Sequence, residues 1–198
     1  MVPTNRAEGL APSYVLDPGM SRFQVKAYAS GMLSAFGHNP TIAIRSFTGE
    51  AWYRPQAPEQ SSFRLEIDAG SLALSSDASE KDRREIERMM QEEVLETARF
   101  PEIRFASSGI DASQLAEGMF AMKILGKLSL HGVERDVVIP CTVMIDEERL
   151  RANGEFSIRQ TDYRIRLVSV AGGTLKLKDE LKFQFDLVGN RRREAFGD

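Results

Sequence analysis

The stretch GMFAMKILGKLSL, residues 118–130, decides the fold of this chain. From Phe120 to Leu130 every second residue is apolar or glycine, and most residues between them are polar or small. Because successive side chains of a β-strand point to opposite faces, the segment has one apolar and one polar face. It therefore predicts a long strand that covers an apolar interior on one side and meets water on the other.

The same two-residue rhythm returns three more times before residue 188. Its apolar positions are Val137, Ile139, Cys141, Val143 and Ile145, then Leu150, Ala152, Gly154, Phe156 and Ile158, then Leu175, Leu177, Leu181, Phe183, Phe185 and Leu187. Four long amphipathic strands joined by short polar turns form a curved antiparallel sheet, which tends to close on itself. A closed barrel has an interior, and what fills that interior is the functional question.

The N-terminal half adds shorter strands. We expect them over 14–29, over 41–53 and from residue 63, with another that opens at residue 103. The apolar parity of 41–53 changes between Ile44 and Phe47, which indicates a bulge that bends the sheet.

One segment has a different period. Between Ser79 and Leu95 the apolar residues are spaced for one face of a helix, and Ser79 with Asp82 forms a capping box. With about eight strands and one helix, the sequence predicts an all-β fold: an eight-stranded antiparallel β-barrel with one amphipathic helix packed over it. We expect residues 1–13 to be a loose lead-in, 14–189 to form the barrel domain, and 190–198 to be a tail.

Composition and charge argue against several classes of function and location. The 198 residues carry 26 Lys and Arg against 29 Asp and Glu, a net charge of −3, which argues against a nucleic-acid partner. No run approaches the roughly 18 apolar residues that a transmembrane segment needs. The first twelve residues lack the apolar core of a secretory signal, so we expect a cytoplasmic protein. The single cysteine, Cys141, lies on an apolar strand face and is expected to be buried.

Several segments in a fixed order resemble the YceI-like family. They are KDRREI (81–86), VLE (94–96), FPEIRF (100–105), GKLSLHGVERDV (126–137), QTDYRI (160–165) and GGTLKLKDEL (172–181). The resemblance covers roughly residues 14–189 and implies a lipocalin-like, extended barrel around an elongated apolar cavity. Members of that bacterial family are associated with polyisoprenoid or similar lipids, often in the periplasm. This chain departs from the family pattern at Gly37-His38-Asn39-Pro40, and we expect it to have no signal peptide.

The apolar inward faces are the candidate ligand-binding site. The residues expected to line it are Phe105, Phe120, Met122, Ile124, Phe156, Ile158, Leu181, Phe183 and Phe185, with Met89 and Met90 from the helix and His38 at the mouth. Aromatic rings offer rigid apolar area and methionines adapt to irregular shapes, which suits a flexible hydrocarbon chain. Ten buried methylenes would contribute roughly 8 kcal/mol before ordering costs. The same residues would equally suit an ordinary packed core.

Catalytic and metal chemistry have little support in the sequence. His38 and His131 are the only histidines, and no zinc-binding spacing accompanies them, so no metal or cofactor is expected. Both stand at apparent turns, where hydrogen bonding within a loop is the usual role.

Three functional hypotheses remain. The first is a non-enzymatic barrel that sequesters or transports a polyisoprenoid or fatty-acyl lipid. The second is a stress-associated scaffold with a side-chain-filled barrel and no ligand. The third is an enzyme with His38 or His131 as general base. Barrels of this kind can also pair along one face into a homodimer, although no residue here specifies it.

Overall fold

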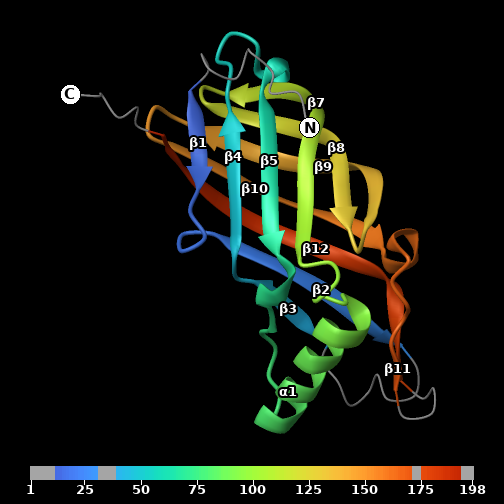
Figure 1. The fold of residues 1–198 in the computed structure, drawn as a ribbon. Coiled ribbons are helices and arrows are strands. Elements are labelled where there is room, and N and C mark those ends of the chain that lie inside the picture. The colour runs from blue at the N-terminus through green and yellow to red at the C-terminus, as the bar shows by residue number, and fades with distance from the viewer. Residues whose placement is uncertain (1–11, 31–38, 171–174, 193–198) are drawn as a thin grey trace.

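Strands make up most of the computed structural model, which describes residues 12–30, 39–170 and 175–192 (Figure 1). The strands are β1 (Ser13–Leu16), β2 (Arg22–Ser30), β3 (Thr41–Ile44), β4 (Phe47–Trp52), β5 (Ser62–Asp68), β6 (Leu72–Leu74), β7 (Glu102–Ala116), β8 (Met119–Leu130), β9 (Val133–Ile145), β10 (Arg149–Arg159), β11 (Ser169–Val170) and β12 (Leu175–Arg191). The helical elements are η3 (Pro58–Gln60), η4 (Ala69–Ser71), α1 (Glu80–Met89), η5 (Met90–Val94) and η6 (Gln160–Tyr163).

Eight of the described strands close into an antiparallel barrel, as the sequence predicted. They follow the order β1-β4-β5-β7-β8-β9-β10-β12, and β12 pairs with β1 to complete the ring. Strands β2, β3 and β6 extend the sheet from the other part of β12. All of the pairings are antiparallel, and the barrel stands upright with α1 below it in Figure 1.

β12 is the longest strand and joins the two parts of the sheet. One of its edges pairs with β10 over Glu180–Asn190. The other edge pairs with β2 up to Asp186 and with β1 from Gly189. A single strand therefore seals the barrel and carries the extension.

The structure divides two predicted strands. The expected strand over 14–29 breaks at Asp17, whose carboxylate accepts the Gly19 N–H at 2.9 Å in a tight turn before β2. The parity change between Ile44 and Phe47 is a break and not a bulge. β3 ends at Ile44 and pairs with β2 and β6, whereas β4 begins at Phe47 and pairs with β1 and β5. Each half turns its apolar residues inward against different neighbours.

The predicted helix is confirmed, together with its cap. The Ser79 hydroxyl accepts the Asp82 N–H at 3.1 Å and donates to the Asp82 carboxylate at 2.6 Å. α1 continues into the π-helical turn η5, which ends one residue before the buried Leu95.

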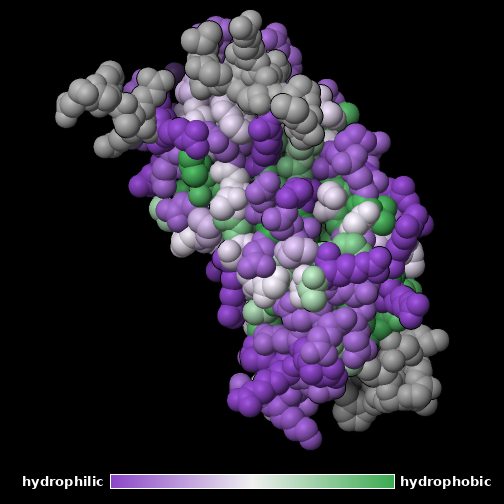
Figure 2. Space-filling view, viewed as in Figure 1, coloured by the Kyte–Doolittle hydropathy of each residue, from purple (hydrophilic) through white to green (hydrophobic). Residues whose placement is uncertain are grey.

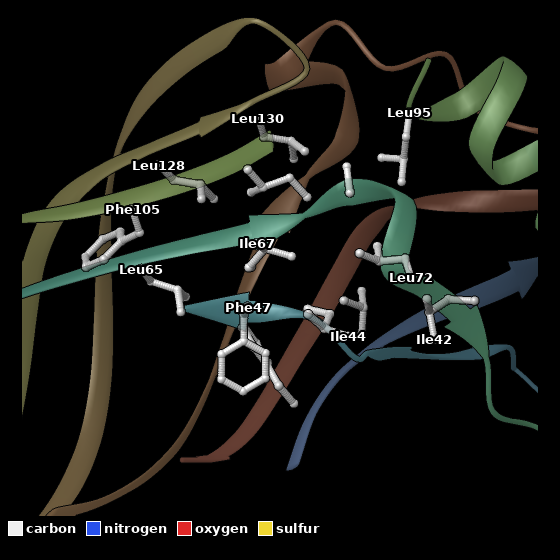
Figure 3. Packing of buried hydrophobic residues seen from close by; sticks show 14 of the residues in the cluster. Ile42, Ile44, Phe47, Leu65, Ile67, Leu72, Leu95, Phe105, Leu128 and Leu130 are labelled. Carbon is white, nitrogen blue, oxygen red and sulfur yellow. The ribbon is translucent and has the colours of Figure 1, made fainter. Parts of the chain in front are cut away.

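Inward side chains form two apolar clusters, one above the other along the barrel. Figure 3 shows part of the larger cluster, where Phe47 of β4, Leu65 and Ile67 of β5, and Leu128 of β8 converge. The smaller cluster gathers Tyr14, Ile110, Phe120, Met122, Cys141, Val143 and Leu150. The members from the long strands occupy positions that the alternation placed inside, whereas Leu95, Tyr163 and Ile165 come from outside the strands.

Gly126 is the one inward-facing position of β8 without a side chain, and the reason is steric. A Cβ added there would lie 2.4 Å from the backbone oxygen of Ala106 and 2.5 Å from the ring of Phe105. The missing side chain lets the Phe105 ring lie against the strand.

We therefore expect Gly126→Ala to lower the free energy of unfolding by about 1–3 kcal/mol, because a backbone oxygen cannot move aside cheaply. Urea unfolding followed by circular dichroism measures it. Gly109→Ala in β7 is the matched control, since a Cβ there meets no atom within 4 Å. Equal stability of the two variants would contradict the steric account.

Candidate functional site

A cavity of about 670 Å³ runs through the barrel. Its lining extends from Ile145 and Leu150, near the β9–β10 turn, to Met89 on the helix and Leu177 on β12. Both apolar clusters contribute to its walls. The volume lies within the range of small-molecule sites in proteins.

The interior is hollow because the inward rings do not fill it. Phe156, Phe183 and Phe185 point inward from β10 and β12, yet each is only partly buried and each lines the cavity. Phe156 and Phe183 stack on each other at 4.8 Å between ring centroids, with 12° between their planes. The two residues are direct cross-strand neighbours, so their rings stack side by side within one wall and leave space across the barrel. A barrel filled by its own side chains, the second sequence-based hypothesis, does not agree with this geometry.

Nine of the twelve residues expected to line the site border the cavity. They are Phe105, Met122, Ile124, Phe156, Leu181, Phe183, Phe185, Met89 and Met90. Phe120 and Ile158 are buried but lie outside the lining. Each is near a strand end, where Phe120 packs against Tyr53 at 6.1 Å and Ile158 joins the larger apolar cluster. His38 lies outside the described residues. Ligand contact by these residues remains a prediction.

We call the place where the two apolar clusters meet along the cavity the waist. Ile124 and Phe185 are the two lining residues that pack against both apolar clusters. Phe185 stands opposite Gly154 in the β10–β12 register, and a Cβ on Gly154 would come within 2.8 Å of its ring. The ring therefore lies across the glycine. The alternation put Gly154 on the inward face but did not reveal that it makes room for an aromatic neighbour.

Polar groups gather at the ends of the cavity. Ser61 and Ser62 border it beside Trp52 and Tyr53, where β4 leads into β5. At the helix end the polar lining comes from Ser76, Asp77 and Asp82. Of these three residues, the sequence had drawn attention only to Asp82, at the start of the helix. Between these ends the lining is apolar apart from Arg104 and Gln160. The Gln160 amide donates to Lys178 O at 2.9 Å.

His131 belongs to a structural junction. Its Nε2 lies 2.7 Å from the Glu96 carboxylate, its Nδ1 lies 3.2 Å from the backbone oxygen of Tyr163, and its ring packs on Phe100 at 4.5 Å. With Gly132 it forms the turn between β8 and β9, both residues having positive φ. The hydrogen-bonding loop role expected for His131 is confirmed. The junction lies outside the cavity lining, which gives His131 no access to a ligand there.

Within the described ranges, no group of three or more His, Cys, Asp or Glu side chains is arranged to hold a metal ion. In the same part of the chain, no helix has the length and apolar character needed to cross a membrane.

Cys141 lies in the cavity wall and is buried, as the sequence predicted. Burial raises the pKa of its thiol from 9.0 to about 11. Because the thiolate is the reactive form, the thiol is poorly nucleophilic near neutral pH.

The fold and the cavity together define a class: a hollow, closed antiparallel barrel with an apolar interior. The family model for the YceI-like domain matches residues 14–189. The chain therefore belongs to the YceI-like family.

Solved structures share this fold at low sequence identity. BcnA of Burkholderia cenocepacia matches with a TM-score of 0.65 and 18% identity over 87% of this chain and 98% of that one. A polyisoprenoid-binding domain from Saccharophagus degradans, implicated in plant cell wall breakdown, matches at 0.63 and 15% over 90% and 98%. The Campylobacter jejuni YceI protein matches at 0.57 and 15% over 77% and 85%. Among curated protein sequences none matches this chain.

Cys141 gives a pH-dependent prediction. Since burial favours the neutral thiol, its contribution to stability is complete below the unfolded pKa near 9.0 and is lost as the pH rises toward 11. Iodoacetamide should alkylate the folded protein slowly at pH 8 and progressively faster between pH 9 and pH 11, as followed by mass spectrometry. The guanidinium-unfolded chain is the control and should react readily by pH 9. Rapid alkylation of the folded protein at pH 8 would show that the thiol is not held in an apolar wall.

Proposed function

We propose that this protein binds one long-chain apolar ligand, a polyisoprenoid or a fatty-acyl lipid, inside the barrel for sequestration or transport. The observation that carries the proposal is the cavity of about 670 Å³ with its apolar wall. A structural relative described as a polyisoprenoid-binding domain supports the same ligand class. Catalysis forms no part of the proposal, and the cytoplasmic location expected from the sequence remains part of it.

The binding energy would come from transfer of hydrocarbon out of water. At about 0.8 kcal/mol for each buried CH₂, a chain that occupies the cavity gains enough to offset the loss of its freedom. The apolar middle section would hold the chain and would not select it by hydrogen bonds. A polar head group would then reside at an end, beside Ser61 and Ser62 or beside Ser76, Asp77 and Asp82.

The primary test is denaturing extraction of the purified protein, followed by mass spectrometry of the organic phase. A stoichiometric polyprenyl or acyl species is the expected result. An empty extract, together with no thermal shift from prenyl alcohols and fatty acids, would overturn the proposal.

A charge in the wall should abolish binding. Phe183→Arg places a guanidinium in the apolar wall, where an unpaired charge is very costly, so affinity for the fluorescent probe N-phenylnaphthylamine should fall at least about tenfold. Gln184→Arg is the matched control on the same strand, because Gln184 hydrogen-bonds Gln24 and Glu155 on the outer face. Fluorescence titration of both variants measures the difference. Equal loss in both would place the probe outside the cavity.

The waist gives a prediction about ligand length. Phe185→Ala removes a large ring from the place where the two apolar clusters meet, which enlarges the space open to a longer chain. Relative to wild type, the affinity ratio of geranylgeraniol to farnesol should rise, measured by displacement of N-phenylnaphthylamine. Phe63→Ala is the control, since Phe63 lines the cavity but packs only against the larger cluster. An unchanged ratio in Phe185→Ala would exclude a role of the waist in length selection.

A further inference from the structure

The helix is fastened to the free edge of the sheet by three side chains. β6 is the last strand in the sheet order, so its outer edge has no strand partner among the described residues. Glu87 accepts the Leu74 N–H at 2.9 Å, and Arg83 donates to Leu74 O. Gln91 donates to Gly70 O at 3.1 Å and to Leu72 O at 3.2 Å. These three residues, spaced four apart along the helix, satisfy backbone groups that a neighbouring strand would otherwise satisfy.

Apolar contact with the core is limited and comes from η5, whose Met90 and Val94 pack against the larger cluster. No residue of α1 or η5, all of which are described, is fully buried, and Ile86 is 38% exposed. The outward face of this end of the molecule is almost entirely hydrophilic (Figure 2). The apolar face of the helix instead borders the cavity through Ile86, Met89 and Met90. The helix therefore forms part of the cavity wall, and the hydrogen bonds of Arg83, Glu87 and Gln91 hold it beside β6.

The C-terminal end of the helical segment is anchored more firmly. Leu95 is buried in the larger apolar cluster, and the carboxylate of Glu96, which has a positive φ, contacts His131 at 2.7 Å. A rigid anchor next to a weakly packed helix places a pivot at residues 95–96. Displacement of α1 about this pivot would break the three side-chain contacts with β6 and open the cavity.

We propose that α1 and η5 form a lid over the cavity, and that Arg83, Glu87 and Gln91 form a latch that sets the rate of ligand exchange. The inference rests on the proposed function, since it assigns the entry route of the same cavity. The latch residues bond the edge of β6 and do not line the cavity. Loss of the latch therefore changes how fast a ligand enters and leaves more than how tightly it binds.

Stopped-flow fluorescence with N-phenylnaphthylamine tests the latch. In Arg83→Ala/Glu87→Ala/Gln91→Ala, the association and dissociation rates should both rise about tenfold or more, while the Kd stays within about twofold of wild type. Glu87→Gln keeps an acceptor oxygen for the Leu74 N–H and should exchange the probe at nearly the wild-type rate.

The matched control lies on the exposed face of the same helix. Arg84→Ala/Arg88→Ala/Glu92→Ala removes three polar side chains at the same spacing, which pair within the helix as Arg84–Glu80 and Arg88–Glu92. Its exchange rates should match those of wild type. Equal rates in the two triple variants, or a faster dissociation with a proportionally weaker Kd, would overturn the latch.

A readout without ligand separates this inference from the proposed function. Hydrogen–deuterium exchange should show faster exchange of the Leu74 amide and of α1 amides in the latch variant than in the control, with β7–β10 unchanged. If the wild-type protein binds neither the probe nor any lipid, the proposed function fails. The comparison of hydrogen–deuterium exchange still tests whether the latch holds α1 against β6. Unchanged protection of the Leu74 amide and of α1 in the latch variant would overturn it.

Discussion

The pairing of both edges of β12 is the constraint on which the rest of the structure depends. Closure of a sheet requires a last strand that bonds the first, and β12 does this with β1 while it also pairs with β10 and β2. Its 17 residues are long enough to serve two successive partners along one edge. Because closure leaves the eight barrel strands without free edges, their backbone groups are satisfied within the wall, and the inward face is free to be apolar.

A hollow interior requires positions in the wall without a side chain, so that aromatic rings can lie close to the backbone there. Gly126 and Gly154 provide this, since a Cβ on either would collide with an inward ring, of Phe105 or of Phe185. Large side chains thus lie along the wall and leave the axis of the barrel open. Ion pairs on the outer face, such as Arg151–Asp186 at 2.6 Å, keep the charged residues of the same strands in water. The cavity therefore results from the placement of residues as much as from their size.

The segments that carry the YceI-like resemblance meet at one end of the barrel. Glu96 contacts His131, Arg135 donates to the Asp162 backbone oxygen, and Thr161 donates to the Asp179 carboxylate. These contacts join the end of the helical segment, the β8–β9 turn, η6 and β12. The motifs are therefore mainly structural, and they identify the fold more directly than they identify a ligand.

The sequence by itself determined which face of each long strand points inward, where the helix begins, and that Cys141 is buried. These features depend on neighbours one, two or four residues away, and local patterns record them directly. Only the tertiary structure decided that Phe156 and Phe183 stack along a wall, that Phe120 and Ile158 lie outside the lining, that the strand after Ile44 changes partners, and that α1 holds the edge of β6. The physical reason is that a cavity is set by distances across the barrel between strands far apart in the chain. Alternation within a strand indicates which residues face inward, but it does not indicate the distance between opposite walls of the barrel.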